Sequence, residues 1–223
     1  MTLIWLCLLS SLALASELKP YQATYEIIRG GKVTGEQTTE LKRLNNNQWL
    51  LTDTTKGTRG MASLIGFKRQ ETSEFTFVDG QLFVTRHSMN QKAAFNKRQY
   101  QFTYDAQEKQ YKGTRKGDQF TLAVTEQNII SAHMLPLALS LTACQQDARA
   151  AIDLLKSTNL SHYQFTFNYQ SDKITSQRVF STPRKKSSTA QLDASKNCLP
   201  VTQTHQEENE PEINSRLTAF NWL

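Results

Sequence analysis

The stretch from Ser161 to Tyr169, SHYQFTFNY, decides the fold class of this 223-residue chain, because aromatic and polar side chains alternate along it without interruption. The aromatic positions are Tyr163, Phe165, Phe167 and Tyr169, and the polar positions between them are His162, Gln164, Thr166 and Asn168. A period of two is typical of a β-strand with one buried face and one solvated face. The stretch therefore predicts a half-buried strand.

The same period recurs along most of the chain. Further strands are expected at 21–27, 33–44, 48–56, 71–78, 81–87, 97–104, 110–115, 119–125, 151–155, 173–180, 188–193, 201–206 and 213–222. Turn signals such as Asp79-Gly80 separate them. The pattern predicts a mainly β protein, a strongly curved antiparallel sheet or partial barrel, in one domain from residue 16 to 223.

One helix is expected, from His133 to about Gln146. Apolar side chains recur there at helical spacing, at Met134, Leu137, Ala138 and Leu141. A stripe of this kind is typical of core packing rather than of a cofactor site. We expect the helix to pack on the concave side of the sheet as a cavity-filling element.

The N-terminus carries an export signal. Residues 3–14 are apolar or small and uncharged, and Ala13-Leu14-Ala15 follows the small-x-small pattern of a cleavage site, so residues 1–15 are expected to be a signal peptide cut after Ala15. The run is shorter than the roughly 20 residues of a membrane span. An uncleaved anchor is the alternative, since no Lys or Arg precedes the run. The signal predicts a periplasmic protein.

Export also bears on the cysteines. Removal of the signal leaves Cys144 and Cys198, and two lone thiols in an oxidising compartment usually pair. The alternative is two separate buried thiols.

The basic charge is concentrated in one part of the chain. The net charge is +6, and residues 42–116 hold 14 Lys and Arg against 6 Asp and Glu. In an exported protein this balance suggests anionic lipids or envelope polymers rather than nucleic acid as partners. A solvated basic surface is the alternative.

The segment Gly57–Gly66 and the residue after it break the strand pattern. Met61, Leu64, Ile65 and Phe67 form an apolar cluster among glycines and basic residues. We interpret it as a candidate contact for a ligand or a membrane, with ordinary core packing as the alternative.

Motifs for catalysis or metal binding do not appear in the sequence. The four histidines, His87, His133, His162 and His205, are isolated, and no CxxC, Walker, GxSxG or GxGxxG pattern occurs. Neighbouring carboxylates occur in sequence only at Glu207–Glu212, in an expected loop. We therefore assign no catalytic residue, metal ligand or cofactor.

Several short segments, taken in order, resemble an exported bacterial family known as domain of unknown function number 3108. They are Tyr25-Glu26 with residues 31–36, Gly60–Phe67 followed by Arg69–Phe75, Asp79–Leu82, Thr182-Pro183 and Leu199-Pro200-Val201. The sequence departs from the family at Arg184-Lys185-Lys186, where a Gly usually follows the Thr-Pro turn, and in its Cys pair. The resemblance implies export and a β fold but no reaction. By looser analogy, the expected fold is similar to the half-barrels of periplasmic lipoprotein carriers.

Three functions remain open at this point. The first is a periplasmic binding or carrier module for an apolar or lipid-like ligand. The second is an envelope assembly protein that binds other proteins, and the third is a hydrolase acting on cell-wall or lipid substrates. The sequence does not distinguish the ligand, the oligomeric state or the pathway.

Overall fold

The computed structural model describes residues 18–125, 128–156, 158–170, 173–180 and 186–223. The expected signal peptide, residues 1–15, and the Thr182–Lys185 turn lie outside the described residues. The first half of the chain forms β1 (Tyr21–Arg29), β2 (Lys32–Arg43), β3 (Gln48–Gly57), α1 (Gly60–Leu64), β4 (Lys68–Val78), β5 (Gln81–Ala93), β6 (Asn96–Asp105), β7 (Gln110–Arg115) and β8 (Asp118–Ala123). The second half forms β9 (Ile129–Ser131), η1 (Ala132–Met134), α2 (Leu135–Cys144), β10 (Arg149–Lys156), β11 (Asn159–Gln170), β12 (Lys173–Val179), β13 (Lys186–Asp193), η2 (Ala194–Lys196), β14 (Leu199–Glu207) and β15 (Ile213–Trp222).

All strands belong to one sheet, in the order β8-β7-β6-β5-β4-β3-β2-β1-β15-β14-β13-β12-β11-β10-β9. The mainly β, strongly curved sheet expected from the sequence is therefore confirmed. Tight turns join many neighbouring strands, and three of them place both central residues at positive φ: Gly30-Gly31, Asp79-Gly80 and Lys116-Gly117. This conformation matches the right-handed twist of the flanking strands.

The sheet rolls up without closing through hydrogen bonds. The end strands β8 and β9 do not pair with each other; instead β9 packs across β5. The strand pairs are antiparallel, as expected, apart from one parallel pair in the described residues, β9 with β10. The reason is that the helix α2 connects these two strands, and a connection of that length permits a parallel pair.

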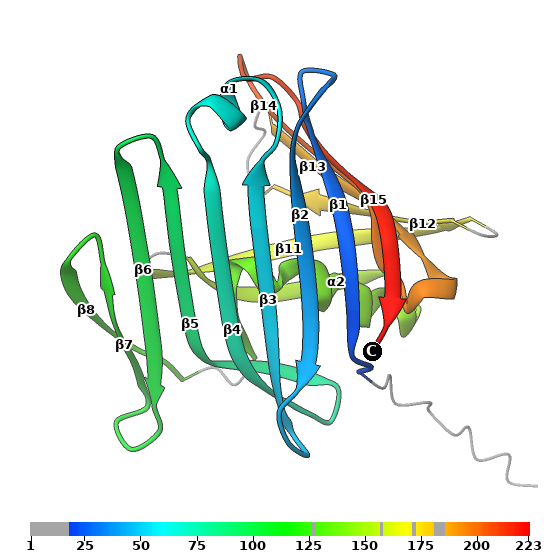
Figure 1. Ribbon diagram of the computed structural model, residues 1–223. Helices are drawn as coiled ribbons and strands as arrows, with labels where there is room; N and C mark the ends of the chain where they lie inside the picture. The colour runs from blue at the N-terminus through cyan, green and yellow to red at the C-terminus, as the bar shows by residue number, and fades with distance from the viewer. Residues whose placement is uncertain (1–17, 126–127, 157, 171–172, 181–185) are drawn as a thin grey trace, which may run out of the picture.

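Helix α2 lies inside the rolled sheet. Figure 1 shows it behind the strands β1–β4, and it contacts β10 and β14. The expected stripe, Met134, Leu137, Ala138 and Leu141, is buried, but so are Leu139, Ser140 and Ala143. The helix is therefore surrounded by core on nearly all sides, which is typical of an enclosed helix rather than of an amphipathic surface helix.

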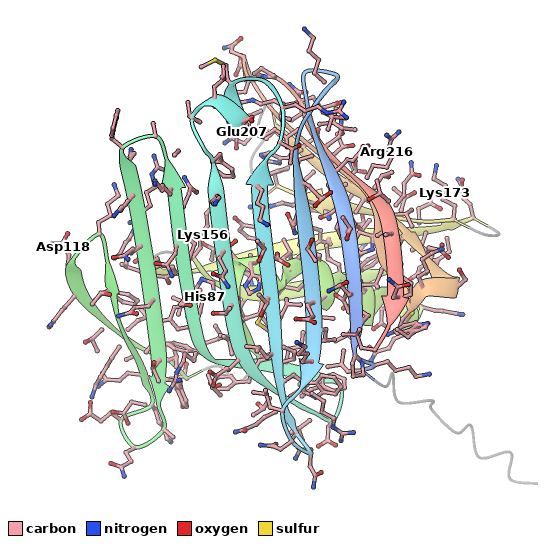
Figure 2. The ribbon with its side chains drawn as sticks, in the orientation of Figure 1. His87, Asp118, Lys156, Lys173, Glu207 and Arg216 are labelled. Atoms are coloured by element: carbon pink, nitrogen blue, oxygen red, sulfur yellow. A yellow bond between two sulfur atoms is a disulfide. The ribbon has the colours of Figure 1, made fainter. Side chains whose placement is uncertain are left out.

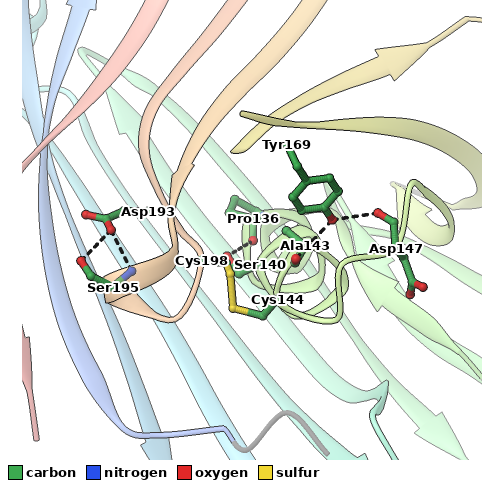
Figure 3. Close-up of a disulfide and its surroundings, with 9 residues drawn as sticks. All are labelled: Pro136, Ser140, Ala143, Cys144, Asp147, Tyr169, Asp193, Ser195 and Cys198. Atoms are coloured by element: carbon green, nitrogen blue, oxygen red, sulfur yellow. Dashed lines mark hydrogen bonds between the residues drawn. A yellow bond between two sulfur atoms is a disulfide. The ribbon is translucent and has the colours of Figure 1, made fainter. Parts of the chain in front are cut away.

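A disulfide fixes the end of this helix. Cys144 is bonded to Cys198 beside β14, with the two Cα atoms 5.6 Å apart, so the alternative of two free thiols is wrong. Next to it, the Tyr169 hydroxyl donates to the Asp147 carbonyl at 2.8 Å (Figure 3). The C-terminal end of α2 is thus held by β11 on one side and by β14 on the other. No helix in the described part of the chain is long and apolar enough to cross a bilayer.

Candidate functional site

A cavity of about 360 Å³ lies between α2 and the concave face of the sheet. Its apolar lining comes mainly from α2 and β11, and its polar lining comes from β2, β3, β4 and η1 and also from β12–β15. The apolar lining includes Leu135, Pro136, Leu139 and Phe165, and the polar lining includes Gln37, Asp53, Glu71, His133 and Ser215.

Asp53 on β3 provides a carboxyl group at the polar wall. The Thr39 hydroxyl donates to its Oδ1 at 2.6 Å, and the Gln37 amide donates to its Oδ2 at 3.2 Å. Burial raises the pKa of Asp53 to about 7; the Thr39 hydrogen bond opposes this shift, and the nearby Glu71 charge adds to it. Asp53 is therefore partly protonated near neutral pH.

Glu71 on β4 lies directly opposite Asp53 in the β3–β4 pair. It differs from Asp53 in having a cation of its own. Arg69 contacts both of its carboxylate oxygens, at 2.8 and 2.9 Å. This two-point contact pairs Glu71 with a cation, whereas Asp53 has no ion-pair partner among the described residues.

Behind Glu71, two serines and two histidines form a buried cluster. The Ser73 hydroxyl is 2.9 Å from His87 Nδ1, 2.7 Å from the Ser131 hydroxyl and 3.2 Å from His133 Nδ1. His87 Nε2 is 3.9 Å from Glu71. Figure 2 shows His87 midway along β5, and the cluster joins β4 and β5 to the inner strand β9 and to η1.

Both histidines are neutral at ordinary pH. Burial, and after it the other histidine's charge, lowers the pKa of His87 to about 3. Burial, followed by the Arg69 charge, lowers the pKa of His133 to about 3. Their role in this state is to exchange hydrogen bonds rather than to carry charge.

Two buried polar atoms of the cavity lining have no hydrogen-bond partner in the described part of the chain. They are His133 Nε2 and Ser215 Oγ. Unpaired buried polar atoms are uncommon, because each one loses its bonds to water. Their presence in the cavity lining indicates that the cavity is suited to a ligand with polar atoms.

A larger recess of about 550 Å³ opens near the β4–β5 turn, with Val78, Phe83 and Tyr104 in its lining. None of the unpaired buried atoms found in the described residues belongs to it. No group of three or more His, Cys, Asp or Glu side chains in those residues could hold a metal ion. We therefore take the cavity beside α2 as the candidate site.

The sequence-based candidates fall into two places. The helix residues Met134, Leu137, Ala138 and Leu141 are buried around α2, whose N-terminal turn borders the cavity. The apolar segment lies far from it, in and after α1, where Met61 and Leu64 are exposed and Ile65 and Phe67 are partly buried. The structure does not bring the two sets together.

The polar wall was missed at the sequence level. Asp53, Glu71 and Ser73 are polar residues at positions that the period of two assigns to the buried face, whereas His87 reaches that face only through the β-bulge between Val84 and Arg86. That mismatch was the available signal. The statement that neighbouring carboxylates occur only at Glu207–Glu212 is correct along the chain but wrong in space, because Asp53 and Glu71 are cross-strand neighbours.

Comparison with known proteins adds information on the fold. No profile of a known protein family matches the chain, and no curated protein matches it. A crystal structure of a beta-barrel-like protein of the domain of unknown function DUF1849 from Brucella abortus is similar, with a TM-score of 0.56 at 10% identity. The match covers 93% of this chain and 99% of the other. The chain thus has a β-barrel-like fold that also occurs in a family of unknown function.

Proposed function

We propose that this protein is a non-catalytic binding or carrier module of the bacterial periplasm, and that its ligand is amphipathic. One observation carries the proposal: a cavity of about 360 Å³ is lined by apolar side chains of α2 and β11 together with two unpaired buried polar atoms. Ligand pockets typically have volumes of about 300–1,000 Å³, mostly apolar walls and a few placed polar groups.

The chemistry of the polar wall selects the ligand's head. Asp53 and Glu71 present carboxyl oxygens, and Arg69 already compensates Glu71. A carboxylate head would face an acid without a free cation, which is unfavourable in a partly buried site. A hydroxyl or amine head would donate to Asp53, and His133 Nε2 could exchange a further hydrogen bond with it. We therefore favour an uncharged or cationic head on an alkyl tail.

The structure offers less support for a hydrolase. Ser73, His87 and Glu71 lie side by side in space, in the order expected of a nucleophile, a base and an acid. Ser73 has no exposed surface, however, and its hydroxyl is already within hydrogen-bonding distance of three side chains. A nucleophile must reach the substrate. An assembly protein that binds other envelope proteins remains the second non-catalytic candidate.

Periplasmic location and membership of family 3108 are parts of the same proposal. The disulfide supports export, because such bonds persist in oxidising compartments. The β-barrel-like fold agrees with the resemblance noted in the sequence, and the fold alone carries no function.

Ligand uptake tests the proposal. The mature chain, purified without detergent and stripped of lipid, is titrated with N-phenyl-1-naphthylamine, which is then displaced by monododecanoylglycerol or by dodecanoate. We expect the glycerol ester to bind at least about tenfold more tightly than the carboxylate, a difference of about 1.4 kcal/mol.

Two variants localise the binding. Leu139→Trp fills the cavity from α2 and should abolish displacement, whereas Val179→Trp changes an exposed position outside the cavity and should not. Failure of the wild-type protein to take up any probe would end the proposal. Equal loss in both variants would show that the cavity is not the site.

A further inference from the structure

Four lysines form a row across the outer face of the sheet. Lys56 on β3 is opposite Lys68 on β4, Lys68 is opposite Lys92 on β5, and Lys92 is opposite Lys97 on β6. All four are exposed. Strands are spaced by about 4.8 Å, so the row is about 14 Å wide. It lies on the face turned toward the viewer in Figure 1, since α2 is behind these strands.

This row is not compensated within the described part of the chain, where none of the four ammonium groups forms an ion pair. Glu36 on β2 is opposite Lys56 and ends the row on that side, but the two groups are not within ion-pair distance. Like charges directly opposite each other destabilise a sheet. Lysines also protect edge strands from aggregation, but β3–β6 are interior strands. An external anion would relieve the repulsion.

Exposed apolar side chains lie at the ends of these strands, just beyond the lysine row. Phe95, in the β5–β6 turn, is fully exposed, and Met61 and Leu64 on α1 are 70% and 81% exposed. The two turns are joined, because the Ala94 N–H donates to the Ile65 carbonyl at 2.6 Å. Phe95 lies two residues before Lys97, which is opposite Lys92, so it is at most about 7 Å beyond the row along the strand direction. Apolar tips therefore stand roughly one headgroup layer beyond the cations.

We propose that this end of the sheet, formed by α1, the β5–β6 turn and the lysine row, docks on the surface of an anionic phospholipid bilayer. Phe95, Met61 and Leu64 enter the interface while the lysines contact lipid phosphates. Apolar anchors combined with a basic face are typical of interfacial binding. A dissolved anionic polymer would satisfy the lysines but leave the apolar tips in water, so the bilayer is the better occupant.

The position of the acidic loop 207–212 determines which side of the sheet faces the bilayer. It is held beside the β1–β2 turn, where Arg29 pairs with Glu210 at 3.8 Å and the Gly30 N–H donates to the Glu212 carbonyl. It is therefore attached to β1 and β2 rather than to β4–β6. An anionic surface repels this loop and attracts the lysine row, so the β3–β6 side faces the bilayer.

Co-sedimentation of the mature chain with vesicles tests the proposal. Vesicles of phosphatidylglycerol and phosphatidylethanolamine should bind it, and phosphatidylcholine vesicles should bind it far more weakly. Each basic residue near an anionic surface contributes about a fivefold change in partitioning. The variant K56Q/K68Q/K92Q/K97Q should therefore lose roughly a hundredfold or more.

The matched control, K19Q/K109Q/K156Q/K173Q, removes the same charge at other exposed positions and should lose less than about fivefold. Phe95→Ser changes a side chain that contacts little and should weaken binding several-fold without affecting the fold; circular dichroism checks every variant. Phe95→Trp should show a blue-shifted emission on anionic vesicles.

Equal losses of vesicle binding in the lysine-row variant and in the control variant would overturn the proposal. The net positive charge of the protein, and not the position of these lysines, would then explain the binding. Binding to dextran sulfate without binding to vesicles would also overturn it and identify an anionic polymer as the partner. Self-association that Phe95→Ser abolishes, without vesicle binding, would identify a second copy of the chain.

Discussion

Replacement of Asp53 by Asn should change how the stability of the protein depends on pH. Burial raises the pKa of Asp53 from 3.8 to about 7. The folded state therefore binds this proton more tightly than the unfolded state does. The stabilisation is complete below about pH 4 and is lost as the pH rises to about 7.

The size of the effect follows from the shift. About three pH units at about 1.4 kcal/mol each give an upper limit of about 4 kcal/mol. Asn cannot ionise, so the free energy of unfolding of Asp53→Asn, relative to wild type, should rise by up to that amount between pH 4 and pH 7.5. Gln37 can turn its amide to accept from the new Asn amide, which preserves the hydrogen bond between these two residues at the loss of the long Gln37–Thr39 bond.

A difference measurement is required because the two buried histidines act in the opposite direction. Burial lowers the pKa of His87 and His133 to about 3, so their contribution is present above pH 6.5 and is lost as the pH falls. In the wild-type protein the opposing slopes partly cancel. The contribution of the two histidines is the same in both proteins, so it cancels in the difference between Asp53→Asn and wild type and leaves the contribution of Asp53, provided the histidine–serine cluster is intact.

Urea unfolding at five pH values from 4 to 8, followed by fluorescence of the buried Trp49, provides the free energies. The control is Asp105→Asn, at an exposed carboxylate whose pKa is lowered by its hydrogen bond from Lys112. Its difference curve should be small and of opposite sign. If the Asp53→Asn curve is flat between pH 4 and 7.5, Asp53 titrates normally in the folded protein and the account of the polar wall is wrong.

Two other perturbations should be measured by the same unfolding assay. Replacing both Cys144 and Cys198 by Ser in the mature chain opens a loop of 54 residues and should lower the free energy of unfolding by up to about 4 kcal/mol; an unchanged stability would contradict this. Thiol titration of the unfolded, unreduced mature chain, which lacks Cys7, should find no free thiol. Ser73→Ala should cost about 1–3 kcal/mol, since His87, Ser131 and His133 all lose a partner, and a cost near zero would mean that the cluster does not hold β9 against β4.

The sequence contained enough information for the strands, because alternation is a local property. The stretch Ser161–Tyr169 lies within β11, and Asp79-Gly80 is the β4–β5 turn. The number of strands also predicted a strongly curved sheet, but the way in which the two ends of the rolled sheet meet could not be read from the sequence. The contact of β9 with β5 depends on the summed twist of many strands and on a helix between β9 and β10. The parallel β9–β10 pair was missed for the same reason.

The candidate site was harder to predict because its members are distant in sequence. Ser73 and Ser131 are 58 residues apart, and Ser73 and His133 are 60 apart. His87 and His133 looked isolated because sequence spacing detects ligand pairs only within one element. The register of β3 with β4 brings Asp53 opposite Glu71, and register depends on turn lengths that no motif records.

The cavity and the lysine row share the strands β3 and β4, and alternation is what separates the two surfaces. On β3, β4 and β5, the positions of Asp53, Glu71 and His87 face the helix, whereas those of Lys56, Lys68 and Lys92 face outward. A one-residue slip in any of these strands would place a lysine against the core and a buried acid in water. The charge pattern therefore disfavours such slips, because burying an unpaired ammonium is costly. It follows that a ligand in the cavity and a bilayer at the lysine row would contact opposite faces of one rigid wall. Leu139→Trp should then leave vesicle binding intact, and the lysine variant should leave ligand uptake intact.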